Sequence, residues 1–198
     1  HTIVIDGTND FSAGDTFATT SANPPDTAYT AYVSWDDTTL YLGLDGDDVG
    51  SGSATRWVQA YFDTTAGGAA QGVVYNTQQP GFPNGFLADA HLRWKADNTF
   101  TRLMTYNGTW TNTGTIPSTF QQDTFVELAV PLADLGAPSR VGVVLFMMNE
   151  EDNFEWTYAG LYSDSFTDGY HAATPILFYL DADFAGALPP NAPSHKKP

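Results

Sequence analysis

Three histidines and one aspartate are the side chains of this sequence best suited to bind a metal ion. Asp89 and His91 are separated by one residue in the alternating segment 86–95, so a strand there would place both on one face, about 7 Å apart. His1 adds an amine and a ring nitrogen that could chelate one ion. Imidazole with nitrogen and oxygen partners suits copper(II). We therefore expect a mononuclear copper site formed by His91 with His1 or His171, and with Asp89 as a neighbour.

Each of these residues also has an ordinary explanation. Asp89 and His91 could form an ion pair on a polar surface, and His171 could be a loop residue without function. His1 could be the remnant of a purification tag or the first residue of a mature chain after removal of a signal peptide. For each residue, the metal-binding and the ordinary explanation are therefore both open.

Aspartates gather in two turns, where their oxygens could bind a hard cation. Asp6 and Asp10 lie in the first turn, and Asp45 and Asp47 lie in the second. Oxygen ligands that converge at the ends of strands suit calcium. Aspartates in turns also accept hydrogen bonds from their own backbone, so a calcium site and a plain turn role are both open.

Aromatic side chains offer another kind of site, one for a saccharide. Trp57 and Tyr61 share a face of the alternating segment 55–63 with Gln59, and Trp110 lies off the expected core. A flat exposed ring provides the apolar surface on which a pyranose stacks. In any sandwich, however, a second layer can bury such a face.

The composition excludes several functions. The 198 residues include 23 acidic and 7 basic ones, with a net charge of -16, so no basic face is available for a nucleic acid. The absence of cysteine removes disulfide and thiolate chemistry. The longest apolar run, 141–148, is too short for a membrane helix. No nucleophile elbow, zinc-protease helix, phosphate loop or pair of glycosidase carboxylates is recognisable, so we expect a protein that is not an enzyme.

Short strands are the elements that must position these residues. Segments 39–45 and 55–63 alternate with the period of a half-buried strand. Similar runs occur at 2–5, 28–35, 71–76, 86–95, 99–106, 124–131, 139–149, 154–161 and 176–181, and their connectors are rich in Gly, Asp, Asn and Pro. About eleven strands without a helical period predict an all-β, antiparallel, jelly-roll-like sandwich. One domain over 1–185 and a Pro-rich flexible tail over 186–198 are expected.

Four segments resemble a known superfamily of β-sandwiches. They are 5–11 (Ile-Asp-Gly-Thr-Asn-Asp-Phe), 31–44 (Ala-Tyr-Val-Ser-Trp-Asp-Asp-Thr-Thr-Leu-Tyr-Leu-Gly-Leu), 58–64 (Val-Gln-Ala-Tyr-Phe-Asp-Thr) and 126–136 (Val-Glu-Leu-Ala-Val-Pro-Leu-Ala-Asp-Leu-Gly). In this order they are similar to family-9 carbohydrate-binding modules (CBM9) and DOMON-like domains. The resemblance implies the sandwich fold. Its members bind sugars, haem or copper, so it implies no single function.

The metal-ligand set resembles those of copper proteins. An N-terminal histidine with an Asp-x-His strand is similar to the ligands of CopC-type periplasmic copper carriers, and with a second histidine it resembles the copper brace of lytic polysaccharide monooxygenases. Copper-binding surface proteins of the MopE and CorA type use two histidines and an oxidised tryptophan. That resemblance implies His91 and His171 as ligands, with Asp89 where the tryptophan would stand.

Together, these patterns predict a secreted, cell-surface or periplasmic monomer that handles copper without hydrolytic activity. A histidine-brace oxidase is the enzymatic alternative. The second prediction is a CBM9-like module that binds a polysaccharide or the cell envelope through Trp57, Tyr61 and Trp110. The third is a surface or adhesion protein stabilised by calcium.

Overall fold

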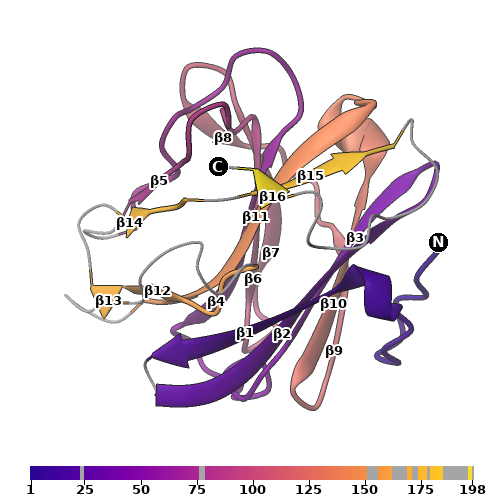
Figure 1. Cartoon of the computed structure of the whole chain (residues 1–198), viewed down its shortest axis with the longest axis vertical. Coiled ribbons are helices and arrows are strands. Elements are labelled where there is room, and N and C mark those ends of the chain that lie inside the picture. The colour runs from indigo at the N-terminus through magenta and orange to yellow at the C-terminus, as the bar shows by residue number, and fades with distance from the viewer. Residues whose placement is uncertain are drawn as a thin grey trace.

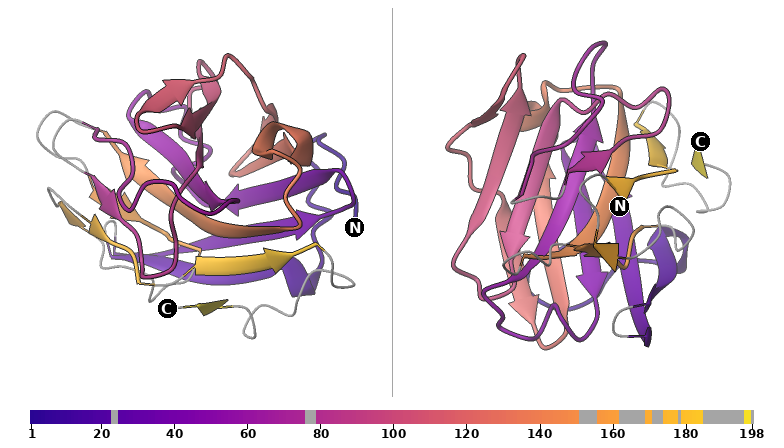
Figure 2. Two further views of the ribbon diagram at one scale, coloured as in Figure 1. Left: turned by 90° about the horizontal axis from the view of Figure 1, so that it is seen from above. Right: turned by 90° about the vertical axis from the view of Figure 1, so that its left-hand side faces the viewer.

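The computed structural model describes residues 1–22, 25–75, 79–150, 156–161, 169–170, 174–177, 179–184 and 196–197. These residues form two antiparallel sheets packed face to face (Figure 1, Figure 2). The all-β sandwich predicted from the alternating segments is therefore confirmed. Within the described ranges, no helix is long and apolar enough to cross a membrane.

The first sheet has five strands in the order β1-β2-β3-β10-β9. They are β1 (Thr16–Ala22), β2 (Pro25–Trp35), β3 (Thr39–Asp45), β10 (Phe125–Pro131) and β9 (Ser118–Gln122). On β3, the alternating residues Leu40, Leu42 and Leu44 point into the sandwich core, as the sequence predicts. A 3-10 helix, η1 (Ala13–Asp15), precedes β1, and another, η2 (Leu132–Leu135), follows β10.

The second sheet is larger and has the order β13-β12-β11-β4-β6-β7-β8, with β15 also paired to β11 and β16 paired to β15. Its strands are β13 (Gly169–Tyr170), β12 (Trp156–Tyr158), β11 (Arg140–Asn149), β4 (Arg56–Asp63), β6 (Ala90–Lys95), β7 (Thr101–Tyr106), β8 (Trp110–Asn112), β15 (Tyr179–Asp183) and β16 (Lys196–Lys197). Two short parallel strands, β5 (Pro80–Gly81) and β14 (Thr174–Pro175), form a separate ladder.

Strand β11 is covered on both faces, which explains its continuous apolar run. Val143 and Leu145 belong to the sandwich core. Val144 and Phe146 belong to a second apolar cluster on the opposite face, where Phe82 and Phe86 also pack. A layer of loop residues therefore covers much of the face of the second sheet that points away from the first sheet. We call this face the outer face.

Several predicted boundaries differ from the structure. Residues 2–5 and 71–75 form no strand, and residue 76 lies outside the described residues. Ile3 instead packs on Tyr41 of the first sheet, and Tyr75 packs on the outer face of the second sheet. Residues that lie flat on a sheet also alternate between buried and exposed, so their pattern imitates that of a strand. Of the expected flexible tail, the structure describes only Lys196–Lys197, which pairs with β15 as β16.

Candidate functional site

The predicted metal and saccharide residues of β4 and β6 lie on the outer face. Inward-pointing neighbours on both strands, including Val58 and Leu92, fill the sandwich core. The outward-pointing residues therefore stand beside one another across the two strands. Their cross-strand pairs are Trp57–Lys95, Gln59–Arg93 and Tyr61–His91.

His91 is a buried structural residue with both ring nitrogens engaged. Its Nδ1 lies 2.9 Å from the carbonyl oxygen of Ala60, so Nδ1–H donates to that oxygen. Nε2 is then an acceptor, and the Tyr75 hydroxyl donates to it at 2.9 Å. Burial lowers the pKa of His91 to about 3, so the ring is neutral at pH 7. His91 in this state offers no free lone pair to a copper ion.

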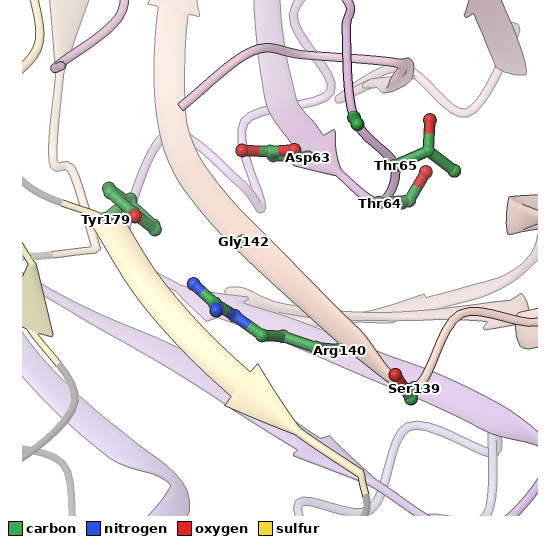
Figure 3. Close-up of a pocket in the computed structure, with 8 residues that line it drawn as sticks. Asp63, Thr64, Thr65, Ser139, Arg140, Gly142 and Tyr179 are labelled. Atoms are coloured by element: carbon green, nitrogen blue, oxygen red, sulfur yellow. The ribbon is translucent and has the colours of Figure 1, made fainter. Parts of the chain in front are cut away.

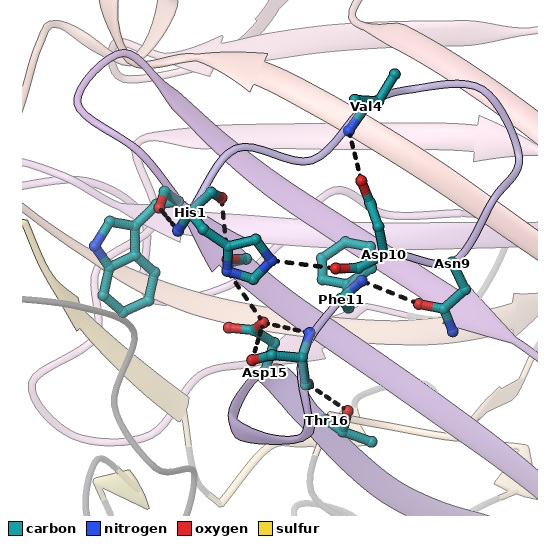
Figure 4. Close-up of polar contacts among 10 residues, drawn as sticks. His1, Val4, Asn9, Asp10, Phe11, Asp15 and Thr16 are labelled. Carbon is teal, nitrogen blue, oxygen red and sulfur yellow. Dashed lines mark hydrogen bonds and ion pairs between the residues drawn. The ribbon is translucent and has the colours of Figure 1, made fainter.

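The structure does not bring His1 or Asp89 into a site with His91. The amine of His1 donates to the carbonyl oxygen of Trp35 at 2.8 Å, and its ring lies near Asp10 and Asp15 at the first sheet (Figure 4). Asp89 accepts hydrogen bonds from the amides of Thr64 and Thr65. His171 lies outside the described residues. The spacing of Asp89 and His91 was therefore a poor guide to their partners, because sequence does not show which layer covers a strand.

Of the four aspartates considered for calcium, Asp6 and Asp47 lie in a bend and a turn, Asp10 lies in an irregular segment, and Asp45 is the last residue of β3. Asp6 Oδ1 accepts from the amide of Thr8 at 2.8 Å, and Asp10 Oδ2 accepts from the amide of Val4 at 3.1 Å. Asp45 accepts from the hydroxyl of Thr124 at 2.7 Å, and Asp47 is exposed in the turn after β3. Within the part of the chain that the structure describes, no three His, Asp or Glu side chains converge as a metal site.

Tyr61 and Trp110 are not exposed platforms for a sugar. Tyr61 is fully buried and its ring stacks on that of His91, while its hydroxyl accepts from the amide of Val73 at 3.0 Å. Burial raises the pKa of Tyr61 well above its ordinary value. Trp110 is half-buried at β8, where its ring meets Tyr61 and His91 edge to face. Both rings contribute to packing at this position.

Trp57 lies at the opposite end of β4 among aromatic and basic side chains, and it is also buried, with 8% of its surface exposed. We define the Trp57 surface as Trp57, Gln59, Arg93, Lys95, Phe100 and Arg102. Trp57 meets Phe100 edge to face, with ring centroids 5.7 Å apart. The guanidinium carbons of Arg93 and Arg102 lie 4.7 and 4.9 Å from the centroid of Phe100, so two cations hold this ring. Lys95 Nζ lies 5.4 Å from the centroid of Trp57.

Three neighbouring polar atoms of the Trp57 surface are buried without a partner. They are Trp57 Nε1, Gln59 Oε1 and Arg93 Nε, which find no hydrogen bond among the described residues. Gln59 and Arg93 are direct cross-strand partners. A buried polar atom left unpaired costs about 1–3 kcal/mol, and such atoms are few in native proteins. The three atoms belong to neighbouring residues of β4 and β6, and they comprise two donors and one acceptor.

A polar pocket lies at the other end of the outer face. It has a volume of about 290 Å³ and is lined by Asp63, Thr64, Thr65, Ala66, Ser139, Arg140, Gly142 and Tyr179 (Figure 3). Asp63 ends β4, and its cross-strand partner Gly142 lies near the start of β11. The Arg140 guanidinium bonds through Nε to the carboxylate of Asp181 on β15.

Sequence reasoning missed the basic residues of the Trp57 surface. A usable signal was present, since three of the seven basic residues fall between 93 and 102 in a strongly acidic chain. No comparable signal marks the pocket, because its lining comes from three segments, 63–66, 139–142 and 179. Only the pairing of β4, β11 and β15 brings them together.

No protein-family model matches this chain, and no curated protein sequence matches it. Solved structures with a similar arrangement include a family-9 carbohydrate-binding module from Caldicellulosiruptor kristjanssonii in complex with glucose. The two chains share 16% sequence identity with a TM-score of 0.42, over 77% of this chain and 76% of that one.

Proposed function

We propose that this chain is an exported, non-catalytic saccharide-binding module whose ligand contacts the Trp57 surface. One observation carries the proposal, namely the unpaired buried atoms Trp57 Nε1, Gln59 Oε1 and Arg93 Nε beside aromatic rings. A sugar hydroxyl both donates and accepts hydrogen bonds, so vicinal hydroxyls can satisfy two donors and one acceptor together. The CH groups of the same ring suit the apolar surface of Phe100, which is half-buried beside Trp57.

The geometry also favours a ligand over a purely structural role. Phe100 is held between Arg93 and Arg102, so its position is set before any ligand arrives. Preorganised side chains lose little conformational entropy on binding, which raises affinity. Export is proposed from the acid-rich, lysine-poor composition of the chain.

Affinity electrophoresis against soluble glucans, xylans, mannans and galactans tests this function. Trp57→Phe keeps an aromatic ring but removes Nε1, and Arg93→Lys keeps the positive charge but removes Nε. Each variant is expected to weaken retardation on the retained glycan by about tenfold, the value of one good hydrogen bond to a charged or buried partner. Trp110→Phe is the matched control, because Trp110 lies outside the Trp57 surface, and it should migrate as wild type.

Two results would overturn the proposal. One is a wild-type protein that no glycan of the panel retards. The other is equal retardation of wild type, Trp57→Phe and Arg93→Lys, since the unpaired atoms would then play no part in glycan binding. Thermal unfolding of each variant shows that a loss of binding does not reflect loss of the fold.

A further inference from the structure

We propose that the pocket lined by Asp63, Arg140 and Tyr179 is a second binding site, which takes one neutral sugar ring or a similar small polyol. The pocket lies at the end of β4 opposite to Trp57. Six residues of extended strand separate Trp57 from Asp63, about 20 Å. The rings of Tyr61, Phe82 and Phe86 lie between the two places on the outer face. One sugar ring cannot occupy both, so the two sites are independent.

The floor of the pocket is made by a residue without a side chain. Gly142 pairs with Asp63 on one side and with Asp181 on the other. A Cβ at this position would lie 3.1 Å from the Phe86 ring and 3.2 Å from Cβ of Asp63. Glycine therefore lets the Phe86 ring pack directly against β11 at the edge of the pocket. Asp63 and Arg140 lie on opposite sides of Gly142 (Figure 3).

The walls of the pocket supply hydrogen-bonding groups and an apolar surface, which are the two kinds of contact that a sugar ring uses. Asp63 Oδ2 accepts from the amide of Leu87 at 3.1 Å, which orients the carboxylate as an acceptor for ligand hydroxyls. Arg140 engages Asp181 through Nε, so its terminal nitrogens can donate to ligand oxygens. Tyr179 is almost fully buried and packs on Phe86 with centroids 5.1 Å apart. Its ring forms a fixed apolar wall.

Charge and size select the class of ligand. The single guanidinium of Arg140 is already balanced by Asp181, and Asp63 adds a further carboxylate, so an anion is disfavoured. Burial raises the pKa of Asp63, and the neighbouring carboxylates of Asp89 and Asp181 add to this rise. Hydroxyls from Ser139, Thr64 and Thr65 complete a neutral polar lining. A volume of about 290 Å³ is at the small end for ligand pockets and suits one ring.

Saturation-transfer NMR and isothermal titration with methyl glucoside, methyl galactoside, methyl mannoside and glycerol test the site. Wild type is expected to bind at least one of them with a millimolar dissociation constant. Ala66→Trp fills the pocket from an exposed lining position, and Asp63→Asn keeps an acceptor for the Leu87 amide while removing the charge. Each is expected to weaken binding by about tenfold or more. Ala133→Trp, an equally exposed alanine in η2, is the control and should bind as wild type.

The outcomes also separate this site from the Trp57 surface. If the pocket binds, Trp57→Phe leaves the affinity for the small ligand unchanged, and Ala66→Trp leaves glycan retardation unchanged. The proposal is overturned if none of the four compounds binds, or if Ala66→Trp binds them as wild type does. It is equally overturned if Trp57→Phe abolishes their binding, since the ligand would then occupy the Trp57 surface and the saccharide function would stand without the pocket.

Discussion

Tyr61 and His91 are cross-strand partners whose rings stack in parallel, with centroids 4.0 Å apart and planes 5° apart. Every polar atom of the His91 ring is paired. One step along the same two strands, Gln59 and Arg93 are also partners, yet each retains a buried atom without a partner among the described residues. A pair whose hydrogen bonds are all formed, Tyr61 and His91, thus lies beside a pair that retains unpaired atoms, Gln59 and Arg93. We assign the first pair to the fold and the second to ligand binding.

The pH dependence of stability tests the structural role of His91. Its pKa is 6.5 when unperturbed and about 3 in the folded protein, so the unfolded state takes up the proton first as pH falls. The contribution of neutral His91 is complete above pH 6.5 and is lost as pH falls from 6.5 towards 3, at about 1.4 kcal/mol per pH unit. His91→Gln does not titrate in this range. We expect it to be less stable than wild type at pH 7.5 by about 2 kcal/mol.

Urea unfolding of wild type and His91→Gln between pH 7.5 and 4.5 measures this effect. The difference between the two free energies of unfolding should shrink as pH falls, reach zero at about pH 5 and then change sign, because only wild type loses stability through this histidine. A difference that stays constant over the whole range would show that His91 does not titrate differently in the folded and unfolded states.

The same variant addresses the copper site expected from the sequence. Both nitrogens of His91 are committed, to Ala60 and Tyr75, so His91 is not a ligand in this arrangement. We expect isothermal titration with Cu(II), and with Cu(I) under reducing conditions, to give the same affinity for wild type and His91→Gln. A loss of about tenfold or more in the variant would restore His91 as a copper ligand and require both hydrogen bonds to break.

The sequence predicted the sandwich well but did not reveal what surrounds the residues that it singled out, for one physical reason. Alternation of apolar and polar residues shows that a strand has one buried and one exposed face. This pattern located β3 at its observed bounds, Thr39–Asp45. It does not report what covers the exposed side. Tyr61 and His91 were therefore expected at a surface and lie in a closed layer. The pocket depends on the pairing of Gly142 with both Asp63 and Asp181, and no local spacing encodes that contact.

Gln59 should show opposite effects on stability and on binding. Its buried Oε1 has no partner among the described residues, and its Nε2 makes a weak contact with Met148 Sδ at 4.0 Å. Gln59→Met therefore removes an unsatisfied acceptor and one weak donor contact, and adds an apolar group of similar size. We expect the free energy of unfolding to rise by about 1 kcal/mol. Glycan retardation should fall by about tenfold, because the acceptor for a ligand hydroxyl is lost. Urea unfolding and affinity electrophoresis measure the two effects on the same sample.

Gln79→Met is the matched control for that experiment. Gln79 Nε2 donates to the carbonyl oxygen of Gly72 at 2.9 Å, so its amide has a structural partner. The control is expected to lose about 1 kcal/mol of stability and to bind as wild type. If Gln59→Met is destabilised like Gln79→Met, the amide of Gln59 is part of the fold and the Trp57 surface loses its main support.

Asp36 stabilises the turn between β2 and β3 and should account for part of the acid sensitivity of the protein. Its carboxylate accepts from the Tyr41 hydroxyl at 2.7 Å and from the amides of Thr38 and Thr39 at 2.8 and 3.0 Å. Burial alone would raise its pKa, but these bonds outweigh burial and lower the pKa from 3.8 to about 2. The resulting stability is therefore complete above pH 3.8 and is lost as pH falls towards 2.

Asp36→Asn tests this contribution, and Asp37→Asn is its control. Solvent screens the partly exposed carboxylate, so we expect Asp36→Asn to cost only about 1 kcal/mol at pH 7. Asp37 is the exposed neighbour in the same turn. The free energy of unfolding of Asp37→Asn should therefore lie within about 0.5 kcal/mol of that of wild type. Because wild type loses its advantage in acid, the gap between wild type and Asp36→Asn should narrow between pH 4 and pH 2.5 in urea unfolding. If Asp36→Asn and Asp37→Asn lose the same free energy of unfolding at pH 7, general surface charge, and not the hydrogen bonds to Tyr41 and Thr38, accounts for the loss.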